Sequence, residues 1–300
     1  MNVAMIGLGK MGINLCENLI RNNNQVVAFD LNENARQEAE KLGAKSVASL
    51  EEVVIALRKP RIVWVMLPAG KPTNETIDRL SKLLDKDDIV IDGGNSFYKD
   101  SLKHNQILKA QGIKFFDCGT SGGKSGANQN GNFMIGGDDY QTFQYIEPIF
   151  KGIAMKDGYL YTGKAGSGHY LKMVHNGIEY GMMEAIAEGF DVLEHSQFKY
   201  DNEAVAKVWS NGSVIRGWLM ELAEDAFSKD SDLENIKGIM HSSGEGQWTL
   251  DEALKLQVPT PVIGMSLMMR YRSLEDDTFT GKVVSALRNE FGGHAIDKTK

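Results

Sequence analysis

Four side chains that can form hydrogen bonds or transfer protons lie within one short stretch of the sequence. They are Lys172, His175, Asn176 and Glu179. On an α-helix this spacing places all four on one face, because the helix repeats about every 3.6 residues. The other positions are mainly apolar, so we expect a buried helix whose polar stripe lines an internal cleft. An amine and a carboxyl group on such a wall suit general acid–base catalysis.

The alternative for this stretch is an ordinary solvent-exposed pair between Lys172 and Glu179. The stripe becomes apolar at Met183 and Ile186, whereas a solvated face would stay polar. We therefore favour the cleft. A lysine that acts as a base must start neutral, so its pKa has to lie below the ordinary value of about 10.4. Burial shifts the pKa of a lysine in that direction.

A glycine-rich turn near the start of the chain predicts a nucleotide site. Gly7, Gly9 and Gly12 form the pattern GxGxxG between a strand-like run and a helix-like segment. This arrangement holds a dinucleotide pyrophosphate at the helix N-terminus. Asp30 ends the second strand, where a carboxylate binds the ribose hydroxyls of NAD and repels the extra phosphate of NADP. We expect NAD, held by Gly7, Leu8, Gly9, Met11, Gly12, Asp30, Leu67, Pro68 and Asn95.

Two further clusters of small polar residues follow predicted strands. One is residues 92–96, which contains Asn95, and the other is residues 117–123, which contains Ser121, Gly122 and Gly123. Ligands of open α/β sheets bind beyond the carboxyl ends of the strands. We expect the second cluster to hold a carboxylate or a hydroxyl group. The first, taken alone, is more typical of a plain turn with a Ser or Asn helix cap.

The elements that position these residues divide the chain in two. Short apolar runs alternate with helix-length segments up to about residue 164, which predicts a doubly wound, mainly parallel sheet of the Rossmann type. From residue 165 the strand signals almost vanish, and long helical patterns take over. We predict an α/β fold with an NAD-binding domain over 1–164 and an all-α substrate and oligomerisation domain over 165–300.

Composition narrows the class of protein. No apolar run approaches the roughly 18 residues that span a bilayer, and no secretory signal is evident. The two cysteines, Cys16 and Cys118, favour a reducing, cytoplasmic compartment. A net charge of −7 argues against a nucleic-acid or membrane-surface partner. No cluster has the spacing of metal ligands, so we expect no metal.

Taken in order, these motifs resemble 6-phosphogluconate dehydrogenase, within the β-hydroxyacid dehydrogenase superfamily. The resemblance covers nearly the whole chain and rests on GLGKMG, DGGNSFYKD, SGG, GSGHYLKMVHNGIEYG, GEGQWT and RNEFGGH. It implies oxidative decarboxylation of 6-phosphogluconate to ribulose 5-phosphate. The broader superfamily shares the glycine turn, the SGG segment and the lysine, but lacks the run His-Asn-Gly-Ile-Glu-Tyr.

The resemblance also implies a role for each matching residue. Lys172 would be the general base, Asn176 would orient the substrate hydroxyl, and Glu179 would protonate the product carbon. The sugar acid would be bound by Asn95, Ser121, Gly122, Gly123 and His175, and its phosphate by Tyr180, Gln247, Thr249 and Arg270. Arg288 and His294 match residues that a neighbouring subunit supplies in the family. We therefore expect a homo-oligomer whose active site is shared between subunits.

The sequence departs from the longer members of the family in several places. The chain is shorter, and Gln247 stands where they have a phosphate-binding lysine, so the phosphate loses one Coulombic partner. Arg272 competes with Arg270 as the phosphate arginine. Asp30-Leu31-Asn32 replaces an Asn-Arg-Thr that is typical of NADP, which favours NAD. Two other functions stay open: a dehydrogenase for an unphosphorylated acid such as 3-hydroxyisobutyrate, and a non-catalytic NAD-binding regulator.

Overall fold

Strands and helices alternate over the first half of the chain. The computed structural model describes residues 1–298. Its first elements are β1 (Asn2–Ile6), α1 (Lys10–Arg21), β2 (Gln25–Phe29), α2 (Glu33–Lys41), β3 (Lys45–Ser46), α3 (Leu50–Ala56), β4 (Ile62–Val65), α4 (Lys71–Leu83), β5 (Ile89–Asp92), α5 (Tyr98–Ala110), β6 (Lys114–Ser121), α6 (Gly123–Asn128), β7 (Gly131–Gly136), α7 (Tyr140–Ile153) and β8 (Ala154–Gly163).

The eight strands form one sheet in the order β3-β2-β1-β4-β5-β6-β7-β8. The strands from β3 to β6 are all parallel, and their order is that of a Rossmann fold. The predicted doubly wound domain is therefore confirmed. The sheet is not parallel throughout, however, because β7 runs antiparallel to β6. The connection through α6 is too short to cross the sheet, so the chain turns back on itself.

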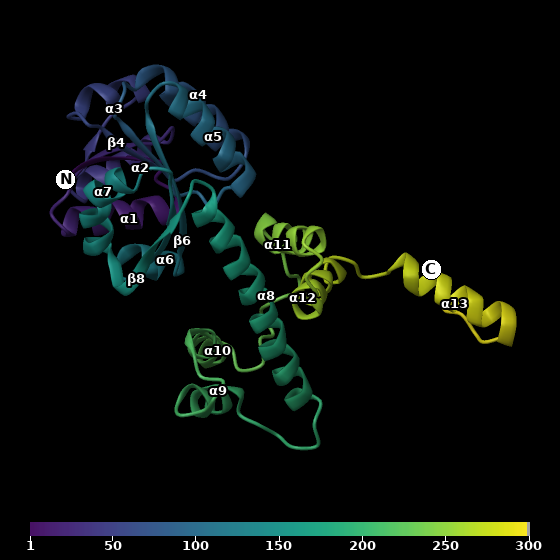
Figure 1. Cartoon of the computed structure of the whole chain (residues 1–300). Coiled ribbons are helices and arrows are strands. Elements are labelled where there is room, and N and C mark those ends of the chain that lie inside the picture. The colour runs from purple at the N-terminus through teal and green to yellow at the C-terminus, as the bar shows by residue number, and fades with distance from the viewer. Residues whose placement is uncertain (299–300) are drawn as a thin grey trace. The chain divides into compact units, whose positions relative to one another are not determined.

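Side chains alternate between the two faces of the sheet and build two core layers. Val3 and Met5 of β1 pack with α1 and α7, whereas Ala4 and Ile6 pack with α3, α4 and α5. Figure 1 shows these two sets of helices on opposite sides of the sheet. Because both faces are covered, the strand interiors are mainly apolar. Only the strand ends remain for ligands.

The rest of the chain is helical, as predicted. It contains α8 (Ser167–Glu194), α9 (Asn202–Ser210), α10 (Trp218–Lys229), α11 (Gly244–Lys255), α12 (Pro261–Arg272) and α13 (Phe279–Gly292). The chain forms two compact units, and the division falls inside α8, between Asn176 and Gly177. In the second unit, Phe190, Ala206 and Phe227 belong to a small core made by α8, α9 and α10. No helix among residues 1–298 is both long and apolar enough to cross a membrane.

Candidate active site

The glycine turn lies between the carboxyl end of β1 and the start of α1. A Cβ atom at Gly12 would lie 2.0 Å from the carbonyl oxygen of Gly7, so α1 can approach the turn only with glycine there. Gly7 has a φ of 94°, a left-handed conformation that favours glycine. Gly9 differs from both, because a Cβ there would meet no atom within 4 Å. Gly9 therefore leaves open space beside the N-terminus of α1, where a pyrophosphate would fit.

Asp30 follows β2 and is tied to the same turn. Its Oδ2 accepts a hydrogen bond from the N–H of Leu8 at 2.7 Å, and its Oδ1 accepts one from Asn32 at 2.8 Å. Arg36 donates to the carbonyl oxygens of Asp30 and Leu31. These bonds fix a carboxylate at the end of β2, beside the glycine turn. Leu67 and Pro68, the other predicted contacts, follow β4, the neighbour of β1 in the sheet.

Lys172 lies in the first third of α8 and is only 4% exposed. Its Nζ donates to Oδ1 of Asn176 and lies 3.3 Å from Nδ1 of His175. Nε2 of His175 in turn lies 3.2 Å from Oγ of Ser121, at the carboxyl end of β6. Three predicted residues of α8 thus form one hydrogen-bonded chain with a fourth from the sheet. A buried amine in such a network can exchange a proton with a bound hydroxyl group.

The SGG segment, predicted to lie beyond the end of a strand, is instead part of β6 and α6. Ser121 ends β6, Gly122 has a φ of 100°, and Gly123 already begins α6. Asn95 also makes bonds that the sequence did not predict. Its amide accepts from the N–H of Thr120 at 2.9 Å and donates to the Thr120 carbonyl at 3.1 Å. It therefore holds the end of β6 beside the segment that follows β5.

A second group of predicted residues lies in the unit that starts at Gly177. The guanidinium of Arg270 stacks 3.7 Å from the ring centre of Tyr180, and its Nη1 donates to the carbonyl of His241. The Tyr180 hydroxyl is hydrogen bonded to Oγ of Ser243 at 3.0 Å, next to the start of α11. Arg272 points elsewhere, to the carbonyl of Glu275. Of the two arginines, only Arg270 thus joins Tyr180.

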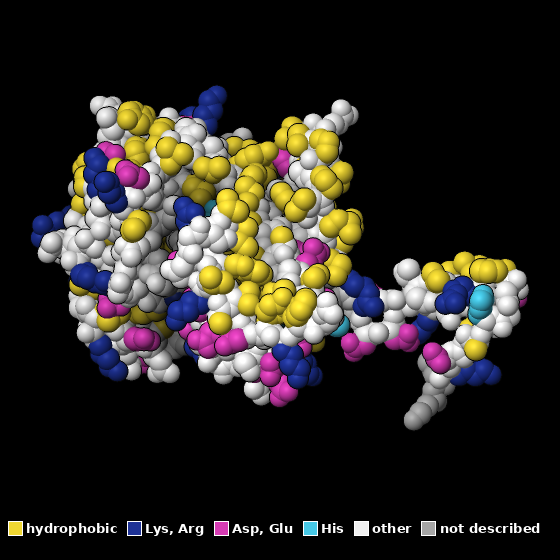
Figure 2. Space-filling view, turned by 90° about the horizontal axis from the view of Figure 1, so that it is seen from below, with side chains coloured by type: hydrophobic (Ala, Val, Ile, Leu, Met, Phe, Trp, Pro, Cys, Tyr) yellow, Lys and Arg dark blue, Asp and Glu magenta, His cyan; other side chains and the backbone are white. Residues whose placement is uncertain are grey.

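The remaining predicted residues of this unit lie on α11 and near the C-terminus. Thr249 is buried and donates to the carbonyl of Glu245, whereas Gln247 is exposed. Arg288 and His294 are both exposed, and α13, which carries Arg288, has no buried residue. Figure 2 shows apolar side chains gathered along one side of this C-terminal segment. Within residues 177–298, no hydrogen bond or ion pair joins Arg288 or His294 to Arg270.

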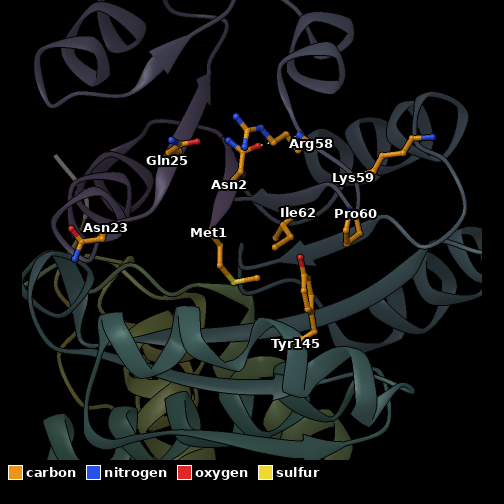
Figure 3. Close-up of a pocket in the computed structure, with 9 residues that line it drawn as sticks. All are labelled: Met1, Asn2, Asn23, Gln25, Arg58, Lys59, Pro60, Ile62 and Tyr145. Atoms are coloured by element: carbon orange, nitrogen blue, oxygen red, sulfur yellow. Dashed lines mark hydrogen bonds between the residues drawn. The ribbon is translucent and has the colours of Figure 1, made fainter.

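A cavity of about 460 Å³ lies in the first unit but outside this set of residues. Figure 3 shows its lining, which includes Met1 and Asn2 at the start of β1, Gln25 at the start of β2 and Ile62 at the start of β4. These are the amino ends of the strands. The glycine turn follows a carboxyl end, so the cavity lies at the opposite edge of the sheet.

Asp117 makes contacts with the start of α8 that the sequence did not predict. It lies within β6, is fully buried, and accepts hydrogen bonds from the N–H groups of Gly166 and His169. Burial raises the pKa of the Asp117 carboxyl, while His169 and the backbone N–H groups oppose that rise. The only signal in the sequence was a carboxylate directly after the apolar pair Phe115 and Phe116.

Family models match both halves of the chain. Residues 2–163 match the NAD binding domain of 6-phosphogluconate dehydrogenase, and residues 168–298 match the C-terminal domain of the same enzyme. The structural relatives agree. The structure of Plasmodium falciparum 6-phosphogluconate dehydrogenase superposes with a TM-score of 0.83 at 28% identity, over 100% of this chain and 67% of that one. A 3-hydroxyisobutyrate dehydrogenase from Salmonella typhimurium, at 17% identity and a TM-score of 0.73 over 91% of this chain and 93% of that one, shares the fold.

Sequence relatives give the same family. The NAD(+)-dependent, decarboxylating 6-phosphogluconate dehydrogenase of Haloferax volcanii is 40% identical over 99% of this chain and 98% of its own length. The decarboxylating enzyme of Escherichia coli is 36% identical over 91% of this chain and 62% of its own, longer sequence. Because both units and nearly every residue are matched, the chain belongs to the 6-phosphogluconate dehydrogenase family.

Proposed function

We propose that this chain oxidises 6-phospho-D-gluconate to D-ribulose 5-phosphate and carbon dioxide while it reduces NAD. The observation that carries the proposal is the hydrogen-bonded network of the buried Lys172 with the half-buried His175, Asn176 and Ser121, in the same unit as the glycine turn. A lysine on a solvent-exposed helix face would keep its amine in water. Lys172 is instead only 4% exposed, and its amine contacts His175 and Asn176. The choice of 6-phospho-D-gluconate as the substrate follows from the family to which the chain belongs.

In this proposal Lys172 removes the proton of the C3 hydroxyl group. Bound NAD would accept the hydride from C3, and this leaves a ketone β to the carboxylate. The protonated Lys172 then donates a hydrogen bond to that ketone, which takes up the electron pair as carbon dioxide leaves. Asn176 orients the hydroxyl. Glu179, two helical turns after Lys172, protonates C1 of the resulting enediol.

The residues of the first unit fit NAD. Gly9 provides space beside the start of α1, which has no side-chain cap of its own, and the N-terminus of that helix favours an anion. The Asp30 carboxylate, fixed beside the turn, favours the ribose hydroxyls and repels a 2′-phosphate. The Haloferax volcanii relative, which is named as NAD(+)-dependent, supports the same choice. We therefore propose NAD rather than NADP as the physiological acceptor.

The substrate phosphate is assigned to Tyr180, Thr249 and Arg270. Arg270 is preferred over Arg272 because its guanidinium stacks on Tyr180, whereas Arg272 donates to the Glu275 carbonyl. One buried nitrogen of Arg270, Nε, has no hydrogen-bond partner within the described part of the chain. A phosphate oxygen would satisfy it. Gln247, which is exposed, would add a neutral hydrogen bond at most.

We also propose a homo-oligomer with active sites shared between subunits. Half or more of the surface of Phe279, Leu287 and Phe291 on α13 is exposed, and so is about half of Ile178 and Met182 on α8. The sequence predicted a buried α8, and these two residues show that a single chain leaves part of it uncovered. Large apolar side chains gathered on an exposed face favour a protein–protein interface. A second copy covering it would bring Arg288 and His294 to a phosphate.

One assay separates this function from its rivals. Purified protein is mixed with NAD and 6-phosphogluconate, and reduced cofactor and released carbon dioxide are measured together. Equal amounts of both products support the proposal. Turnover of 3-hydroxyisobutyrate without carbon dioxide would indicate the unphosphorylated-acid dehydrogenase, and NAD binding without turnover of either acid would indicate the regulator.

A further inference from the structure

The first turn of α8 is capped from the sheet and not by its own sequence. The first N–H groups of a helix lack partners within the helix and are usually bonded by the residue that precedes it. That residue here is Gly166, which has no side chain. Instead, Oδ1 of Asp117 accepts from the N–H of Gly166 at 2.5 Å, and Oδ2 accepts from the N–H of His169 at 2.8 Å.

Three glycines let this turn lie directly on the sheet. A Cβ atom at Gly119 would be 2.4 Å from Cβ of Lys172, and one at Gly168 would be 2.3 Å from the carbonyl oxygen of Met134. A Cβ atom at Gly136 would be 2.7 Å from the Asp117 carboxylate itself. None of these contacts leaves room for a side chain at the glycine. The start of α8 therefore packs directly on the backbone of β6 and β7, and this packing fixes the position of Lys172.

We propose that Asp117 is a positioning residue for Lys172, and this inference rests on the proposed role of Lys172 as the base. Each oxygen of the carboxylate accepts a hydrogen bond from one N–H group, that of Gly166 or that of His169. Its negative charge also lies at the N-terminus of the long helix α8, which is the positive end of the helix dipole. Lys172 follows His169 by less than one turn, so a shift of the capped turn moves the amine directly. Asp117 itself touches no substrate in this account.

The test replaces Asp117 by Asn, which keeps the size of the side chain. An amide has one oxygen and one N–H₂ group, so one of the two backbone N–H groups would face another donor. We expect kcat to fall by about 10- to 100-fold, which is the scale of a misplacement of about 1 Å. The KM for NAD should stay within about twofold, because Asp117 bonds to α8 and not to the glycine turn.

Asp138→Asn is the matched control. The Asp138 carboxylate accepts from the N–H of Ala165 at 3.3 Å, one residue before Gly166, but its side chain is 35% exposed and bonded to Lys109. This variant should keep kcat within about twofold. A loss that is equal in Asp117→Asn and Asp138→Asn would overturn the inference, since it would show only a general sensitivity of the segment.

Hydrogen–deuterium exchange of the ligand-free protein provides a readout that does not depend on the substrate. Exchange over residues 164–172 should be faster in Asp117→Asn, while exchange over α1 is unchanged. If the wild-type protein does not turn over 6-phosphogluconate, the proposed function fails, and unchanged exchange over 164–172 would still overturn the positioning role. If the wild-type protein is active and Asp117→Asn keeps its kcat, the inference alone fails.

Gly119→Ala tests the same contact without touching the carboxylate. Its Cβ atom would push on Cβ of Lys172, so kcat should fall while the KM for NAD is kept. This variant decides the matter if Asp117→Asn does not fold. A folded Gly119→Ala protein with wild-type kcat would show that Lys172 tolerates displacement, and that result would overturn the inference.

Discussion

Two glycines of the same turn should respond to alanine in opposite ways. At Gly12 an added Cβ would lie 2.0 Å from the carbonyl oxygen of Gly7, more than 1 Å closer than an ordinary carbon–oxygen contact of about 3.3 Å. The oxygen belongs to the backbone, and the place of the Cβ is fixed by the backbone of α1, so α1 has to move. At Gly9 the added Cβ would meet nothing within 4 Å, and the φ of −64° suits alanine. Gly12 is thus required by the fold, and Gly9 by the ligand.

The expected magnitudes follow from this difference. Gly12→Ala should cost about 1–3 kcal/mol of stability, the usual range for overpacking. At roughly 2–4 °C per kcal/mol this lowers the Tm by several degrees. Gly9→Ala should leave the free energy of unfolding within about 0.5 kcal/mol of the wild type. Its methyl group would occupy the proposed pyrophosphate space, so the Kd for NAD should rise by at least about tenfold, or about 1.4 kcal/mol.

Thermal unfolding of the ligand-free proteins and calorimetric titration with NAD measure the two effects separately. A Gly9→Ala protein that binds NAD as tightly as the wild type would show that the pyrophosphate does not occupy the space beside Gly9. A Gly9→Ala protein that loses as much stability as Gly12→Ala would show that the fold itself needs this open space.

Four further predictions concern single features of the chain. Asp30→Ala should narrow the preference for NAD over NADP in kcat/KM by about tenfold or more, and a preference for NADP in the wild type would contradict the cofactor assignment. Arg270→Ala should raise the KM for 6-phosphogluconate far more than Arg272→Ala does; equal effects would contradict the phosphate assignment. Removal of residues 285–300 should abolish turnover, and activity that survives would argue against a shared site. Asp139, whose pKa is lowered to about 2 by Lys114 and by its cap on α7, should add about 1 kcal/mol of stability near pH 7. Because the folded pKa of Asp139 lies below its unfolded value, this stabilisation is lost as the pH falls from about 4 to 2. The difference in free energy of unfolding between wild type and Asp139→Ala should therefore vanish over that range in acid unfolding curves. A difference that persists below about pH 2 would contradict this.

The sequence was informative where a pattern is repeated along a local element. The alternating strands and the long helix around Lys172 each carry their own periodicity, the glycine turn carries its own spacing, and all of them are present in the structure. The predicted Ser121 and His175 also meet, because a strand end and a helix start adjoin there. Local sequence patterns were sufficient to predict these features.

What the sequence could not provide was pairing between distant segments. The antiparallel direction of β7 depends on the short connection through α6, which has no periodicity of its own. The cap of Asp117 on α8 joins residues about 50 positions apart. In the same way, the amide of Asn95 binds the backbone of Thr120 instead of remaining open to a ligand. Such contacts follow from tertiary packing, which composition and spacing do not encode.

The proposed function depends on the buried amine of Lys172, which acts as the base that takes the hydroxyl proton as the hydride leaves C3. The most direct test is to compare Lys172→Met, which keeps a long unbranched side chain, with the wild type in NAD reduction driven by 6-phosphogluconate. We predict that turnover falls by at least about 10³-fold while the Kd for NAD remains unchanged. A Lys172→Met protein that still reduces NAD at a rate near that of the wild type would contradict the account.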